Sequence, residues 1–369
     1  RIKIVNTSMP IKYKSIAYNK LNMLNTLEPG GGEYYKQKKW LDAYLKIPFN
    51  NYKETPCSIE KNNIQECRNY MKNCKKIMDD CVYGMDDAKS QIIQMIGQWV
   101  TNPTTIGQSI AIQGPMGTGK TTLVKEGISK ALGRDFEFIS LGGVSDGSYL
   151  DGHSYTYEGS IWGKIVETLI HCKSMNPVIY FDELDKACSK HGHVNEITSI
   201  LIHLTDPNMN NAFQDRFFQG VDFPLDKVIM MFSYNDSSLV DPILLDRIKE
   251  ITVNPYTIND KLEIIKNFTL PELINNIGFD DLDIKVSNEL IEYIIDNYTM
   301  EAGVRDIKRK MEDILLTLNL DKICKKGMFA KNRKTLRLTE KIIKDTLKSP
   351  IDDNTTIHQN PEIGIISGL

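Results

Sequence analysis

One glycine-rich loop has the residue types and spacing to bind phosphate groups. It follows a short apolar run, opens a predicted helix, and fits the pattern G-x-x-x-x-G-K-[ST]. Glycines let such a loop turn its backbone N–H groups toward phosphate oxygens, and the helix N-terminus adds positive potential. Lys120 would reach the β- and γ-phosphates of a nucleotide, and the Thr121 hydroxyl would bind Mg²⁺. The predicted phosphate-binding positions are Gly114, Pro115, Met116, Gly117, Thr118, Gly119, Lys120, Thr121 and Thr122.

A pair of carboxylates supplies the second part of such a site. The segment VIYFDE, residues 178–183, places four apolar residues before Asp182 and Glu183. The apolar residues predict a buried strand, and parallel α/β sheets bind ligands beyond the carboxyl ends of their strands. Asp182 would hold the Mg²⁺ shell. Glu183 would polarise a water for attack on the γ-phosphate.

These candidate residues need a sheet to position them. The segments SIAIQG, FEFISL, PVIYFDE and VIMMFSYN predict one strand each, and helical patterns separate them. This alternation favours an α/β fold, with a parallel sheet flanked by helices on both faces. The phosphate loop should lead into a helix from about Thr121 to Leu132. Beyond Pro255 amphipathic helical patterns dominate, which predicts a small all-helical domain, and LRLTEKIIKDTLKS would add a final strand and helix.

The N-terminal part is also predicted to be helical. After the breaker at residues 29–32, one stripe of a helix carries Tyr35, Trp40, Leu41, Tyr44 and Leu45. Residues 62–100 are helical again, with an interruption at 83–84. We predict the end of an N-terminal region with a linker helix over 1–61 and a large α/β nucleotide-binding domain over 62–256. A small helical domain over 257–350 and a linker with the first strand of a further domain over 351–369 would follow.

Composition excludes some classes of protein. Hydrophobic residues make up 41% and charged residues 25% of the 369 residues, which is usual for a soluble globular chain. The net charge of −3 gives no basic excess, so nucleic acid is not expected as the main partner. No apolar run is long enough to span a membrane. The seven cysteines form no Cys-x-x-Cys pair and predict reduced thiols, in the cytoplasm rather than an organelle matrix.

Beyond these two motifs, the chain resembles the AAA+ ATPases, and more narrowly the ATPase module of Lon proteases. The resemblance runs from about Glu33 to the last residue and rests on VYGMDDAK, SLGGVSDGSYLDGHSYTYEG, LLDRIKEI and YTMEAGVRDIKRK. It implies ATP and Mg²⁺ as cofactors and a homo-oligomer, with six subunits as the family's number. It also implies that IGIISGL, residues 363–369, enters a Ser-Lys peptidase domain.

The resemblance assigns roles to further residues. Tyr83 and Gly84 would line the adenine pocket, where a simple break between helices is the alternative. Asn235 matches the polar sensor that orients the attacking water, although an Asn at a strand end also forms turns. Arg247 matches the arginine finger that acts on a neighbouring subunit. Arg305 matches the second sensor on the lid, and for each arginine the alternative is an ordinary surface charge.

The segment SYTYEGSI carries the substrate loop of that family. Tyr157 and Gly159 keep the expected aromatic residue and glycine, but Glu158 replaces an aliphatic residue. An aromatic ring can hold varied polypeptides by packing, so unfolded proteins are the expected partners. A carboxylate beside it should weaken the grip on acidic segments. A remodelling ATPase without a peptidase and a nucleic-acid ATPase remain the alternative functions.

Overall fold

The computed structural model describes all residues except 158, 189–195, 280–282, 325–334, 348–349 and 351–369. The chain divides into two compact units. The first comprises Arg1–Gly114 and Gly119–Val253, and the second comprises Pro115–Thr118 with Asn254 onward. Residues 351–369, where the sequence predicts the first strand of a further domain, lie outside the described residues.

The first unit is built on a five-stranded parallel sheet with the order β2-β3-β6-β1-β7. Its strands are β1 (Ser109–Gln113), β2 (Phe136–Ser140), β3 (Val178–Asp182), β6 (Ile229–Tyr234) and β7 (Lys249–Thr252). The order confirms the predicted α/β fold class and puts β1 between strands that come much later in the chain. The carboxyl ends of β1, β3 and β6 therefore meet at one edge, where open α/β sheets bind ligands.

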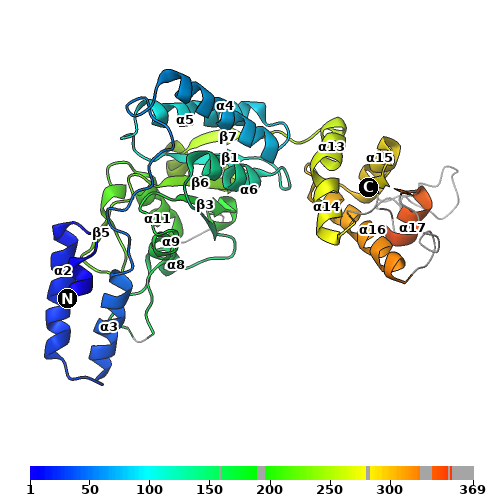
Figure 1. Ribbon diagram of the computed structural model, residues 1–369. Helices are drawn as coiled ribbons and strands as arrows, with labels where there is room; N and C mark the ends of the chain where they lie inside the picture. The colour runs from blue at the N-terminus through cyan, green and yellow to red at the C-terminus, as the bar shows by residue number, and fades with distance from the viewer. Residues whose placement is uncertain (158, 189–195, 280–282, 325–334, 348–349, 351–369) are drawn as a thin grey trace. The chain divides into compact units, whose positions relative to one another are not determined.

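Helices cover both faces of this sheet (Figure 1). On one face, α4 (Ile64–Cys81), α5 (Asp86–Thr101) and the helical segment of α6 (Lys120–Thr122), η1 (Leu123–Ser129) and α7 (Lys130–Leu132) pack on Val178 and Tyr180. On the other, α8 (Ser148–Asp151), α9 (Lys164–Cys172) and α11 (Glu196–Thr205) pack on Ile179 and Phe181. Because side chains alternate along a strand, the four apolar residues of β3 serve both cores.

Short elements connect the main strands and helices of the first unit. They are α10 (Leu184–Cys188), η2 (Asn210–Ala212), β4 (Phe213–Gln214), β5 (Asp222–Phe223), η3 (Ser237–Leu239) and α12 (Pro242–Asp246). The strands β4 and β5 form an antiparallel pair apart from the main sheet. Asp241 is the N-cap residue of α12, and its Oδ1 accepts from the N–H of Ile243 at 2.8 Å. This hydrogen bond fixes the residue at which the helix begins.

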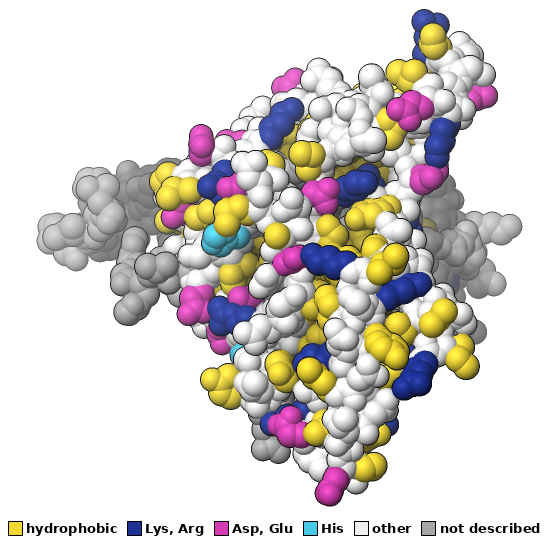
Figure 2. All heavy atoms as spheres, turned by 90° about the vertical axis from the view of Figure 1, so that its left-hand side faces the viewer, with side chains coloured by type: hydrophobic (Ala, Val, Ile, Leu, Met, Phe, Trp, Pro, Cys, Tyr) yellow, Lys and Arg dark blue, Asp and Glu magenta, His cyan; other side chains and the backbone are white. Residues whose placement is uncertain are grey.

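The N-terminal helices α1 (Ile2–Val5), α2 (Ile11–Thr26) and α3 (Gly32–Tyr44) belong to the first unit. Trp40 stacks on Tyr44 at 4.9 Å between ring centroids, and its indole N–H donates to the Phe217 carbonyl. The predicted apolar stripe is wrong at Tyr35, which is 60% exposed. The side of the molecule that carries α2 and α3 in Figure 1 shows hydrophobic side chains among Lys and Arg in Figure 2.

The second unit is mainly helical, as the sequence predicts. Its helices are α13 (Ile258–Ile264), η4 (Ile265–Thr269), α14 (Leu270–Ile277), α15 (Asn288–Tyr298), α16 (Arg305–Ile323) and α17 (Glu340–Leu347). Two short parallel strands, β8 (Asp283–Lys285) and β9 (Thr335–Arg337), accompany them. Ile291, Ile314 and Ile343 lie in its separate core.

Candidate nucleotide-binding site

The phosphate loop begins in a space that admits no side chain. Gly114 follows β1, and its N–H donates to the Tyr234 carbonyl at 3.2 Å. A Cβ at Gly114 would lie 2.6 Å from the Val253 carbonyl oxygen. Gly119 directly precedes α6 with a φ of 92°, a conformation that favours glycine. At Gly114 a side chain would collide with the backbone, and at Gly119 the backbone conformation favours glycine. The helix begins at Lys120, one residue earlier than predicted.

Lys120 lies at the centre of the candidate site and is almost fully buried. Its Nζ donates to the Asn235 Oδ1 at 3.0 Å and to the Gly114 carbonyl. Burial lowers the pKa of Lys120, and the carboxylates of Asp182 and Asp185 oppose that effect. The structure therefore brings together the predicted phosphate-binding lysine and the predicted sensor Asn235, which are 115 residues apart in the chain.

A row of hydroxyl groups lies between Thr121 and Asp182. The Thr121 Oγ1 donates to the Tyr180 hydroxyl at 3.2 Å, and the Ser233 Oγ donates to the Asp182 Oδ1. Burial raises the pKa of Tyr180 to about 12, and the neighbouring hydroxyl groups of Ser233 and Thr121 oppose that effect. The sequence motifs gave no indication of Tyr180 or Ser233, because each reads as one residue of an apolar strand.

Glu183 has a conformation that is uncommon for a residue with a side chain. Its φ is 59°, in the left-handed region, immediately after the end of β3. Its Oε1 forms an ion pair with Lys186, and this pairing raises the pKa of the lysine. A Cβ at Gly142 would lie 1.8 Å from the Glu183 Oε2. The first glycine of the GGV stretch therefore leaves room for this carboxylate, which the sequence alone did not explain.

The loop that carries Asn235 is fixed by a further carboxylate. Asp185 is buried, and its Oδ2 accepts from the N–H of Asn235 at 3.1 Å and of Asp236 at 3.4 Å. Asp185 was not predicted as a site residue, although it lies only three positions after Asp182. The backbone of the predicted sensor Asn235 is therefore held by a residue of the same DELDK segment that carries the two predicted carboxylates.

The turn between α4 and α5 lies against the phosphate loop. A Cβ at Gly119 would be 3.4 Å from the Val82 Cγ1. Tyr83 is partly buried, and Gly84 has a φ of 65°. The predicted adenine-binding turn is thus near the predicted phosphate site, which is the arrangement that one bound nucleotide requires.

Comparison with protein-family models identifies two parts of the chain. Residues 110–256 match the ATPase family associated with various cellular activities (AAA), and residues 275–317 match the Lon protease AAA+ ATPase lid domain. The chain is an AAA+ ATPase module of the Lon type. Both the resemblance seen in the motifs and the fold class are confirmed.

The Lon-type module is similar to curated proteins over most of its length. It is 43% identical over 330 residues to a "Lon protease homolog" of Acanthamoeba polyphaga mimivirus, covering 87% of this chain and 31% of that protein. It is 31% identical over 361 residues to the "Lon protease" of Campylobacter concisus (strain 13826), covering 97% and 42%. "Lon protease 1" of Bacillus subtilis (strain 168) is 29% identical over 367 residues, covering 100% and 45%. The chain spans less than half the length of these relatives.

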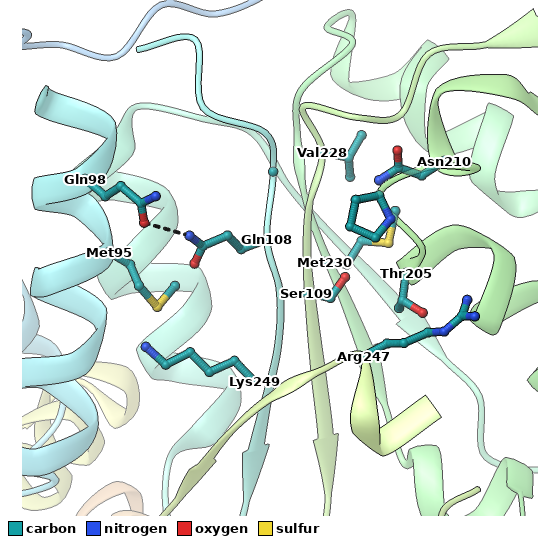
Figure 3. Close-up of a pocket in the computed structure, with 12 residues that line it drawn as sticks. Met95, Gln98, Gln108, Ser109, Thr205, Asn210, Val228, Met230, Arg247 and Lys249 are labelled. Atoms are coloured by element: carbon teal, nitrogen blue, oxygen red, sulfur yellow. Dashed lines mark hydrogen bonds between the residues drawn. The ribbon is translucent and has the colours of Figure 1, made fainter. Parts of the chain in front are cut away.

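Arg247 of this Lon-type module lies away from the nucleotide site of its own subunit. It is the C-cap residue of α12, and its Nη1 donates to the Ile202 carbonyl at 2.8 Å. The same atom lies 3.0 Å from the Asp206 Oδ2. The arginine lines a cavity of about 330 Å³, and Lys249, Gln98 and Gln108 lie on the opposite side of it (Figure 3).

That cavity is separate from the predicted phosphate site. Ser109 and Met230, from the beginnings of β1 and β6, line it. The phosphate loop follows the other end of β1. An arginine at the amino ends of the strands cannot reach a nucleotide at their carboxyl ends in the same subunit.

The remaining predicted residues are placed as follows. Arg305 is the first residue of α16, and within the second unit the Val304 N–H donates to the Gly117 carbonyl at 3.1 Å. Tyr157 is 70% exposed, Gly159 has a φ of 78°, and Glu158 lies outside the described residues. In the described part of the chain, no helix has the length and apolar character to cross a membrane.

Proposed function

We propose that this module binds ATP with Mg²⁺ and hydrolyses it at the edge formed by β1, β3 and β6. The observation that carries the proposal is the convergence of Lys120, Asn235 and the Asp182–Glu183 pair at the carboxyl ends of these strands. The AAA family match supports nucleotide binding at the same residues. The donor set also suits Mg²⁺, because Thr121 and Asp182 offer a hydroxyl and a carboxylate, both hard oxygen ligands.

Each side chain has one task in this reaction. Thr121 and Asp182 would hold the Mg²⁺ that accompanies ATP, and the ion would supply positive charge to the phosphate groups. Lys120 leaves its Asn235 and Gly114 partners to bind the β- and γ-phosphate oxygens. Asn235 then orients a water, and Glu183 accepts the proton of that water as it attacks the γ-phosphate. The uncommon backbone conformation of Glu183 supports this role, since such strain is common at functional sites.

Lys120→Ala is expected to abolish binding of ATP, because the phosphate charge loses its only cation from this loop. Lys125→Ala is a matched control, since this lysine lies five residues further along the same helical segment with a mostly exposed side chain. Titration of each variant with a fluorescent ATP analogue tests the prediction. Wild-type affinity in Lys120→Ala would refute the proposed site.

We propose further that the module drives unfolding and translocation of proteins in a ring of subunits, with six as the expected number. The chain's similarity to Lon proteases supports this, as does the exposed ring of Tyr157 on the predicted substrate loop. The substrate would pass to a Ser-Lys peptidase domain of the same protein. The matches to Lon proteases and the Lon lid favour neither a remodelling chaperone nor a nucleic-acid ATPase. The cytoplasm is the proposed compartment, since all seven cysteines are free thiols.

Unfolded protein is expected to raise the ATPase rate, and Tyr157→Ala should abolish this stimulation without changing basal turnover. The reason is that the exposed ring can contact a polypeptide but takes no part in the nucleotide site. Tyr18→Ala, which removes another exposed tyrosine on α2, should leave stimulation intact. ATPase rates with and without casein measure the effect. Full stimulation of the ATPase rate in Tyr157→Ala would show that another residue contacts the substrate.

A further inference from the structure

We propose that Tyr180 is a positioning residue that sets the direction of the Thr121 hydroxyl for Mg²⁺ binding. The inference rests on the proposed function, because it concerns the same Mg²⁺–nucleotide site. It assigns a task to a side chain that the sequence motifs indicate only as one residue of an apolar strand. Tyr180 is the third residue of β3, and its side chain is fully buried.

Three hydroxyl groups and one carboxylate lie next to one another at this edge of the sheet. Thr121 donates to Tyr180, and Ser233, which lies beside Tyr180, donates to Asp182. Tyr180 and Asp182 point to the same face of β3 because they are two residues apart. Ser233 follows Phe232, which pairs with Phe181 across β6 and β3. The sheet register therefore places the Ser233 hydroxyl beside both groups.

The hydrogen of Thr121 is directed at Tyr180, because the Thr121 Oγ1 donates to the tyrosine hydroxyl at 3.2 Å. The lone pairs of the Thr121 oxygen therefore remain for a metal ion. Asp182, the other proposed Mg²⁺ ligand, follows two residues after Tyr180 on the same face of β3 and accepts from Ser233.

The phenol ring is held independently of its hydroxyl. Phe138 stacks on Tyr180 at 5.8 Å between ring centroids, and Phe136 lies at 6.1 Å. A phenylalanine would keep the packing and remove only the hydrogen-bonding group. Thr121 would then lose its acceptor.

Tyr180→Phe is therefore the variant to test, by titration of this chain with a fluorescent ATP analogue in EDTA and in Mg²⁺. In EDTA we expect the variant to bind the ATP analogue with an affinity within about twofold of wild type. The factor by which Mg²⁺ raises this affinity should be about 3- to 10-fold smaller than in the wild type, which corresponds to the loss of about one hydrogen bond. The Mg²⁺ concentration that gives half-maximal binding should rise by the same factor. Tyr70→Phe, which removes the hydroxyl that donates to the Ala131 carbonyl, should change neither value.

A purely structural role for the hydroxyl would lower the melting temperature and leave the Mg²⁺ dependence unchanged. The proposal would be overturned if the affinity of Tyr180→Phe for the ATP analogue depended on Mg²⁺ as in the wild type. It would also be overturned if that affinity fell by the same factor with and without Mg²⁺. Should Tyr180→Phe fail to fold, Tyr180→Leu removes the same acceptor of the Thr121 hydrogen with another apolar side chain and must show the same selective loss. Failure of the wild-type chain to bind any nucleotide would contradict the proposed function itself, and this inference with it.

Discussion

Glu183→Gln is expected to bind ATP as tightly as the wild type and to hydrolyse it about 10²- to 10⁴-fold more slowly, the range for loss of a general base. Glutamine keeps the length and nearly the shape of the side chain, so it can occupy the space beside Gly142. It cannot accept a proton from the attacking water. The affinity should persist because Lys120 and the phosphate loop are unchanged. Binding of a fluorescent ATP analogue and release of phosphate measure the two effects separately.

The chain offers a closely matched control for this substitution. Glu167 pairs with Lys164 three residues away, as Glu183 pairs with Lys186, and both carboxylates are partly exposed. Glu167→Gln removes one surface ion pair of the same kind far from the predicted site, and such pairs contribute little to stability. It should hydrolyse ATP at the wild-type rate. A Glu183→Gln variant that also retains this rate would show that another group activates the water.

The fold was predictable wherever a strand is buried on both faces. The strands β1, β3 and β6 are apolar runs, and the sequence indicated each of them. The fifth strand, β7, was missed because KEIT shows no such run and only Ile251 is buried. It lies at the edge of the sheet beside β1, where one neighbour is enough to form the strand. Backbone pairing, rather than composition, decides such a strand.

The candidate site was predictable only where a motif is contiguous in the chain. Lys120, Asp182 and Glu183 belong to two such motifs, and parallel topology explains why they meet. The contributions of Gly142 and Tyr180 depend on how β2, β3 and β6 align, which periodicity does not specify. A glycine pair after a strand was the only signal for Gly142. Nothing in an apolar run distinguishes a tyrosine that packs from one that also positions a ligand.

Arg247 is the residue whose proposed role depends most on assembly. Both of its contacts in the described structure use Nη1, one to the Ile202 carbonyl and one to Asp206. These contacts hold the guanidinium at the amino ends of the strands, beside the cavity shown in Figure 3. We therefore expect the partly exposed side chain to act on a nucleotide that another subunit presents. Asp206 would hold the finger in position for that neighbour.

Arg247→Ala alone should lower the ATPase rate about 10³- to 10⁵-fold, as loss of an arginine finger does. Mixing it with Glu183→Gln should restore activity, because some interfaces then pair an intact Glu183 with an intact Arg247. For random mixing of equal amounts in a head-to-tail ring, about a quarter of the interfaces would be complete. Arg309→Ala, which removes an exposed arginine of α16, should keep full activity without mixing. Phosphate release across mixing ratios, with mixed rings verified by mass, tests this. If mixed rings form and no ratio restores activity, Arg247 acts within its own subunit.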